Sequence, residues 1–233
     1  MYSNTIVSND DISRIWGNDG FRVFLSHKNQ VKKETADLKD RLKTYGITCF
    51  VAHENIEPTL PWQNEIEKAL FSMDALVALI SEGFHDSDWT DQEIGVAFGR
   101  KVPIVSAKLG DNPRGFLGKF QALPCNWESA AEEIVKILIK NEKMIDAYIN
   151  MVNNCNSFAE GNILSKLLPH ITTLSESQIS NLIFAFNENE QVAYSHGFDG
   201  TKPFEHGNGL VYHLNRVTDN QYEYTDDKKI RIK

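Results

Sequence analysis

Short apolar segments alternate with amphipathic helical segments between residues 21 and 143, and this alternation restricts the chain to few folds. The apolar segments have the length of buried strands, while the segments between them repeat apolar residues at helical spacing. The expected strands are residues 21–26, 47–51, 74–80, 102–106 and 123–127, and the expected helices are residues 31–45, 62–73, a segment ending near Arg100, and 128–143. Strands joined through helices run parallel. The sequence therefore predicts an α/β fold, with helices on both faces of a parallel sheet.

Both ends of the chain depart from this alternation. Residues 1–18 are polar and predict a lead-in with a short helix near residues 12–16. Residues 145–233 predict an accessory domain, either α+β or mainly helical, whose residues indicate no known family. Its expected helices are residues 145–158, 162–170 and 175–186, and residues 210–214 are expected to pair with residues 221–224 as a hairpin.

Composition excludes several classes of protein. A hydrophobic content of 41% and a charged content of 24% are ordinary for a globular protein with its own core. The net charge of −8 disfavours nucleic-acid binding, which needs a basic face. No run of apolar residues reaches the length of a membrane span, and the first residues lack the pattern of a secretion signal. We therefore expect a cytoplasmic protein that contacts neither nucleic acid nor membrane.

Cysteines and histidines do not form a recognisable metal or disulfide pattern. Cys49, Cys125 and Cys155 are an odd number without a CxxC pair, and Cys49 falls on a core position of an expected strand. The three C-terminal histidines match no familiar spacing of metal ligands; they are His196, His206 and His213. No metal site is predicted.

One segment after the third expected strand carries side chains suited to a ligand site. In residues 87–95, Ser-Asp-Trp-Thr-Asp-Gln-Glu-Ile-Gly, Trp89 and Glu93 stand four positions apart, which on a helix directs both side chains to one face. The segment lies at the carboxyl edge of the predicted sheet, where open α/β sheets bind ligands. A structural alternative stays open, in which Trp89 packs in the core and Glu93 completes a capping box with Thr90.

Three segments, taken together, resemble the sequence boxes of the Toll/interleukin-1 receptor (TIR) domain. Residues 21–27 read Phe-Arg-Val-Phe-Leu-Ser-His, close to the first box, with Arg22 in place of its usual Asp. Residues 45–51 lead into the polar loop of the second box, and residues 81–94 follow the third, with Thr90 in place of its usual Cys. The resemblance covers about residues 19–140. It implies a flavodoxin-like fold with a five-stranded parallel sheet over residues 19–143.

The resemblance also implies a chemistry for Glu93. A subset of TIR domains, widespread in bacteria, cleaves NAD at the nicotinamide–ribose bond, and its catalytic residue is the Glu of the Trp-x-x-x-Glu segment. Ordinary glycosidases need a second carboxyl group to protonate the leaving oxygen. Nicotinamide leaves NAD as a neutral molecule, so one carboxylate can both orient the ribose and stabilise the developing cation. NAD is then a consumed substrate, and no bound cofactor is expected.

Residues after the first strand are expected to bind NAD at the same edge. Ser26, His27 and Lys28 occupy the positions where active TIR domains carry polar or basic groups. Lys28 would face the pyrophosphate, and the alternative is a solvated loop lysine. His85 is near enough to contribute, although a lone loop histidine more often lies at the surface.

The loop over residues 52–61 corresponds to the BB loop of the family, which mediates assembly and borders the site. Glu57 and Trp62 have the spacing of an acidic residue and an aromatic residue in active members. Trp62 or Trp89 would stack on a base or on the nicotinamide ring. The alternatives are an exposed loop acid for Glu57 and a first buried helix position for Trp62.

The leading hypothesis is a bacterial NAD glycohydrolase or ADP-ribosyl cyclase acting in anti-phage immunity. It would release nicotinamide together with ADP-ribose or a cyclic isomer, after self-association through TIR domains. An upstream sensor or a downstream effector would complete the pathway. A non-enzymatic TIR scaffold, including a virulence factor that mimics host adaptors, is the second hypothesis, and a base-exchange or ribosyl-transfer enzyme is the third.

Overall fold

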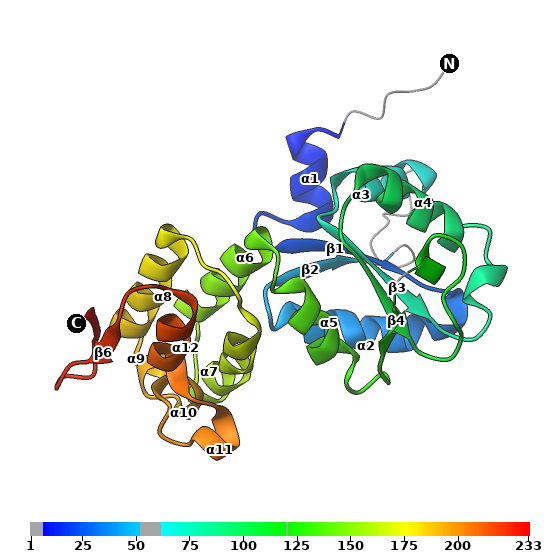
Figure 1. The fold of residues 1–233 in the computed structure, drawn as a ribbon. Coiled ribbons are helices and arrows are strands. Elements are labelled where there is room, and N and C mark those ends of the chain that lie inside the picture. Colours follow the sequence, from blue (N-terminus) through cyan, green and yellow to red (C-terminus); the bar gives the residue numbers. More distant parts are fainter. Residues whose placement is uncertain (1–6, 52–61, 120) are drawn as a thin grey trace. The chain divides into compact units, whose positions relative to one another are not determined.

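The computed structural model describes residues 7–51, 62–119 and 121–233. It divides into two compact units, Met1–Val135 and Lys136–Lys233 (Figure 1). The first unit contains a five-stranded parallel sheet in the order β2-β1-β3-β4-β5. The strands are β1 (Phe21–Ser26), β2 (Ile47–Phe50), β3 (Ala75–Ile80), β4 (Ile104–Lys108) and β5 (Leu123–Pro124). The predicted α/β fold and its flavodoxin-like strand order are confirmed.

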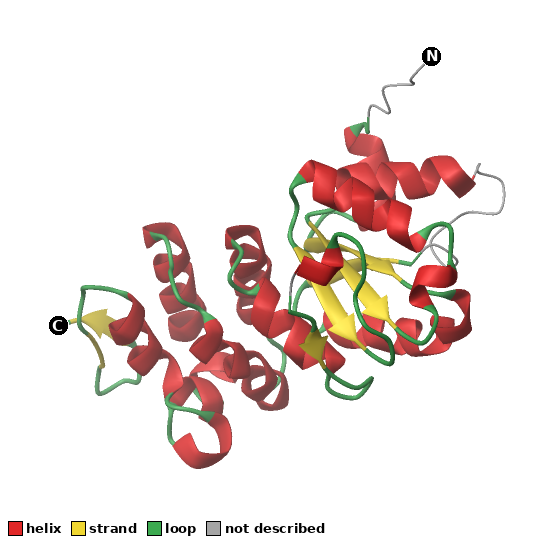
Figure 2. Ribbon diagram, turned by 45° about the vertical axis from the view of Figure 1, so that its right-hand side comes forward, coloured by secondary structure: helices red, strands yellow, loops and turns green. Residues whose placement is uncertain are grey.

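Helices cover both faces of this sheet (Figures 1 and 2). One face carries α1 (Asn9–Trp16), α3 (Trp62–Ser72) and α4 (Thr90–Arg100), and the other carries α2 (Lys32–Lys43) and the start of α5 (Ala130–Leu138). Three short 3-10 turns complete the unit over its described residues: η1 (Asn29–Val31), η2 (Phe84–Asp86) and η3 (Leu117–Lys119). Every residue of β3 is buried, as expected for a central strand covered on both faces.

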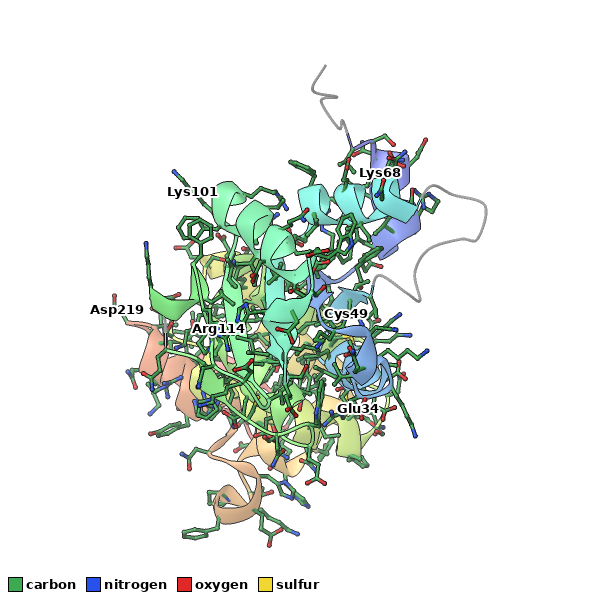
Figure 3. The ribbon with its side chains drawn as sticks, turned by 90° about the vertical axis from the view of Figure 1, so that its right-hand side faces the viewer. Glu34, Cys49, Lys68, Lys101, Arg114 and Asp219 are labelled. Atoms are coloured by element: carbon green, nitrogen blue, oxygen red, sulfur yellow. The ribbon has the colours of Figure 1, made fainter. Side chains whose placement is uncertain are left out.

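The N-terminal helix α1 belongs to the core of the first unit, which the prediction of a lead-in did not anticipate. Trp16 is buried, its indole Nε1 donates to Ser72 Oγ at 2.8 Å, and its ring packs against Phe50. Figure 3 labels Lys68 of α3, and its Nζ donates to Asp11 Oδ1 of α1 at 2.7 Å. These contacts attach α1 to α3 and to the edge strand β2, so the folded unit begins before the first strand.

Two boundaries differ from the prediction for local reasons. The helix expected over residues 128–143 ends at Leu138, and the next one, α6 (Glu142–Asn153), begins before the expected residue 145, because the Asn141 side chain caps it by accepting from Lys143 N. The fourth strand begins at Ile104 rather than at residue 102, since Pro103 has no N–H and contributes only its carbonyl, which accepts from Leu76 N at 2.9 Å.

The second unit is mostly helical and carries a small hairpin. After α6 its elements are α7 (Phe158–Leu164), η4 (Ser165–His170), α8 (Glu176–Glu188), α9 (Glu190–Ala193), α10 (His196–Asp199), α11 (Pro203–His206), α12 (Gly209–Val217), β6 (Tyr222–Tyr224) and β7 (Ile230–Ile232). Among the described residues, no helix combines the length and the apolar character that crossing a bilayer requires.

The predicted pairing of residues 210–214 with residues 221–224 is wrong. Residues 210–214 lie in α12, where Leu210 and Leu214 are four positions apart and both buried. Periodicity in so short an apolar run does not distinguish a strand from a helix. The strand β6 pairs instead with β7 in antiparallel register. The Asn215 side chain joins α12 to this hairpin, because it bonds both the N–H and the carbonyl of Tyr222.

Candidate active site at the carboxyl edge of the sheet

The candidate site lies where β1 ends between its two neighbours. The chain leaves β1 toward β2 on one side and later returns to β3 on the other, so the strand order reverses at β1. Parallel strands end at one edge, and such a reversal opens a crevice there. Ser26 is the last residue of β1, and Glu93 stands in the first turn of α4, which packs against β1 and β3.

Ser26 and Glu93 form a direct, buried contact. The Ser26 hydroxyl donates to Glu93 Oε2 at 2.5 Å, the short end of the range for a hydroxyl that donates to a carboxylate. Ser26 is fully buried, and Glu93 is 6% exposed. Two predicted site residues that are far apart in the chain are thus brought together, and the carboxyl group is fixed at the end of the sheet.

The structural alternative for this segment, a core tryptophan with a capping glutamate, is not realised. Trp89 occupies the position before α4 without a side-chain cap, and it is 39% exposed. Thr90 Oγ1 donates to the Phe84 carbonyl at 2.8 Å instead, which ties the start of the helix to η2. Glu93 therefore points to Ser26 rather than back to the start of its helix. The Trp89 carbonyl accepts from Glu93 N at 2.9 Å, so the two residues keep helical spacing although only Glu93 is buried.

Burial changes the acid–base behaviour of Glu93. Removal of the carboxylate from water raises the pKa of Glu93 from 4.5 to about 7, although the Ser26 hydrogen bond acts in the opposite direction. A carboxyl group with this pKa changes its charge close to neutral pH. Carboxyl groups perturbed in this way at the edge of a sheet are typical of functional sites.

Lys28 and His27 follow Ser26 at the same edge. Lys28 Nζ lies 3.7 Å from Asp86 Oδ2, beside the turn at Gly83. Gly83 has φ +67°, and a Cβ there would approach Lys28 Nζ to 2.7 Å, so this turn favours glycine. His27 Nδ1 lies 3.1 Å from the Leu25 carbonyl oxygen. The Lys28 ammonium group is therefore held at the turn after β3, close in the chain to the Glu93 helix.

Comparison with known proteins identifies the family of the first unit. The family model described as TIR domain matches residues 23–138, which contain most of β1, all of β2 to β5 and the Ser26–Glu93 pair. Residues 23–138 are a TIR domain. The helix α1 precedes the matched range.

One solved TIR domain is similar in structure. It is the crystal structure of the TIR domain of the Toll-related receptor TRR-2 from Hydra magnipapillata, with 16% sequence identity and a TM-score of 0.40. The match covers 48% of this chain and 89% of the Hydra chain. No curated protein matches the chain.

The remaining predicted contacts of the TIR domain lie partly outside the described residues. Glu57 and the whole loop over residues 52–61 fall outside them. Trp62 begins α3, and its side chain is likewise not described. Trp89, by contrast, exposes part of its indole at the start of the Glu93 helix. Stacking on a substrate ring stays a prediction for both tryptophans.

His85 is more closely built into this region of the TIR domain than its loop position indicated. Its side chain is only 6% exposed, and its Nδ1 lies 2.8 Å from Asp91 Oδ1. Its Nε2 is buried and has no hydrogen-bond partner among the described residues. The sequence carries no repeat that pairs residues 85 and 91, because η2 and α4 are separate elements whose junction sets the contact. His85 is thus the residue near the site that sequence reasoning undervalued.

Proposed function

We propose that the TIR domain cleaves NAD at the nicotinamide–ribose bond, with Glu93 as the catalytic carboxylate. The observation that carries this proposal is the Glu93 carboxyl group itself, buried at the carboxyl edge of the sheet and held there by Ser26. A scaffold domain gains no stability from a buried carboxylate, since burial without an ionic partner is costly. A catalytic role would explain why the carboxylate is buried despite this cost in stability.

The chemistry needs one ionised carboxylate and no general acid. As the bond between ribose C1′ and the pyridinium nitrogen breaks, its electron pair neutralises the nicotinamide ring, which leaves without a proton. Positive charge develops on the ribose, and a carboxylate beside the ribose hydroxyls both orients the sugar and stabilises that charge. Water then adds at C1′ and loses a proton to give ADP-ribose. Alternatively, an adenine nitrogen adds and gives a cyclic isomer.

Other residues of the TIR domain would bind the rest of NAD. Lys28 supplies a positive charge near the edge of the sheet that suits the pyrophosphate, and the exposed indole of Trp89 suits stacking on a ring. His27, Glu57 and Trp62 complete the set of residues that would contact NAD, and Ser26 contacts the Glu93 carboxyl group. The biological role we propose is bacterial anti-phage defence, either by depletion of NAD or by a nucleotide signal. The second unit would then sense the trigger.

Association between TIR domains is the second candidate function, because TIR domains commonly self-associate. The observation that favours it is a stacked pair of exposed rings, Phe98 of α4 and Phe116, whose centroids lie 4.5 Å apart. These side chains are 40% and 47% exposed. Paired aromatic rings at the surface are typical of protein interfaces. Self-association is compatible with both an enzyme that acts as an assembly and a non-enzymatic scaffold.

The decisive experiment incubates the purified full-length chain with NAD over a series of protein concentrations and separates the products by chromatography and mass spectrometry. Glu93→Gln should abolish nicotinamide release. The matched control is Glu65→Gln, another buried glutamate of the same unit, whose carboxylate pairs with Arg14 instead of lying at the sheet edge. Equal loss in both variants would indicate a folding defect. No release by the wild-type protein at any concentration would reject the enzyme in favour of a scaffold.

A further inference from the structure

We propose that Ser26 is a positioning residue, which holds the Glu93 carboxylate in place for the ribose rather than touching NAD itself. This inference rests on the proposed NAD cleavage. In this proposal the Ser26 hydroxyl, at the end of β1, bonds the catalytic carboxylate and not the substrate.

The geometry commits the Ser26 hydroxyl to a single partner. A hydroxyl group has one proton to donate, and that of Ser26 goes to Glu93 Oε2 at 2.5 Å. The side chain is fully buried, so substrate cannot reach it without displacing the surrounding residues. Ser26 is also the last residue of β1 in register with β3, opposite Ala78. The donor is therefore fixed by the strand ladder, which is the rigid part of the domain.

The contact leaves one oxygen of Glu93 for chemistry. Oε2 accepts from Ser26, whereas Oε1 accepts no hydrogen bond from the described residues. Rotation about the last side-chain bond would exchange the two oxygens, and the hydrogen bond to Ser26 opposes that rotation. Oε1 is thus the oxygen that would meet the ribose hydroxyls, in an orientation set before substrate binds.

Most charged side chains on the neighbouring elements contact other groups. The ion pairs are Lys28–Asp86, His85–Asp91, Arg14–Glu65, Lys68–Asp11 and Arg22–Asp74. Arg100 donates to the Leu70 carbonyl, and His27 contacts the Leu25 carbonyl. Glu67 and Lys108 are exposed to solvent. Two influences on the Glu93 carboxyl group remain, burial and the Ser26 hydroxyl. The hydroxyl is therefore the polar group that favours the ionised form.

Removal of the hydroxyl has a consequence that a merely structural role would not produce. Without the donor, the ionised form of Glu93 is less stable and its pKa rises further. If cleavage requires the carboxylate, the acid limb of the pH–rate profile moves to higher pH. A hydrogen bond to a charged group corresponds to a shift of roughly one pH unit or more. A packing defect lowers the rate at every pH but does not move the limb.

The test measures nicotinamide release against pH for the full-length chain and three variants. Ser26→Ala removes the donor, and Ser26→Thr retains a hydroxyl on a side chain that suits a strand. Ser106→Ala is the matched control, because Ser106 is a buried serine of β4 whose Oγ has no hydrogen-bond partner in the described part of the chain. We expect the acid limb to rise by about one pH unit in Ser26→Ala. It should stay at its wild-type position in Ser26→Thr and Ser106→Ala.

The outcomes separate the two proposals. If the wild-type protein cleaves NAD and the limb of Ser26→Ala does not move, the positioning role is refuted while the proposed function stands. The positioning role is also refuted if the acid limb moves equally in Ser106→Ala, or if the limb of Ser26→Thr moves as far as that of Ser26→Ala. If the wild-type protein releases no nicotinamide at any pH, the proposed function fails and the role of Ser26 fails with it.

Discussion

Replacement of Glu93 by glutamine should stabilise the TIR domain at neutral and higher pH. The pKa of this carboxyl group is 4.5 in its ordinary state and about 7 in the folded domain, because burial penalises the charge. Between these two values the folded state holds a proton that the unfolded state has released. Stability of the wild-type protein therefore falls as pH rises through this window. The difference in pKa corresponds to a loss of about 3 kcal/mol above pH 7.

Glu93→Gln removes the titration and keeps an oxygen that can accept from Ser26. The variant should match the wild-type free energy of unfolding near pH 4 and exceed it by about 3 kcal/mol near pH 8. Urea unfolding at several pH values measures this difference. Tryptophan fluorescence restricts the signal to the first unit, since all four tryptophans precede residue 136.

The control for this measurement is Asp88→Asn, an exposed carboxylate next to the same helix. It should leave the pH dependence of unfolding unchanged. The reasoning is refuted if Glu93→Gln is no more stable than the wild-type protein at pH 8, or if their difference is the same at every pH. Increased stability together with lost nicotinamide release would identify Glu93 as a residue kept for activity at the expense of stability.

Three further results are expected. Trp16→Ala should destabilise the first unit by about 3–5 kcal/mol in urea unfolding, because it removes a buried ring, whereas Ala at the exposed Phe71 should change stability little. Lys28→Ala should raise the KM for NAD in steady-state assays with a smaller effect on kcat, and the exposed Lys101→Ala should change neither. Burial lowers the pKa of His213 to about 4, so stability of the second unit should fall as pH drops from 6.5 toward 4; hydrogen exchange should show no such loss in His213→Leu.

Local patterns were sufficient for the fold of the first unit and for the position of its key carboxylate. The periods of strands and helices are visible in residues close together in the chain. The alternation over residues 21–138 therefore predicted the five parallel strands without knowledge of any tertiary contact. Parallel strands must end at one edge, and this rule put Ser26 and Glu93 in the same region. The local patterns did not indicate that Trp89 would be 39% exposed while Glu93 is buried.

Contacts between distant segments required the folded chain. The Ser26–Glu93 hydrogen bond joins residues 67 positions apart, and the Trp16–Ser72 bond joins residues 56 positions apart. Neither leaves a periodic trace, because its geometry depends on how a helix packs on a sheet. The His85–Asp91 contact and the pairing of β6 with β7 join nearer residues, but no sequence pattern predicted either of them. Residue type and spacing determined which groups reach the sheet edge, whereas packing decided which of them touch and how far water is excluded from Glu93.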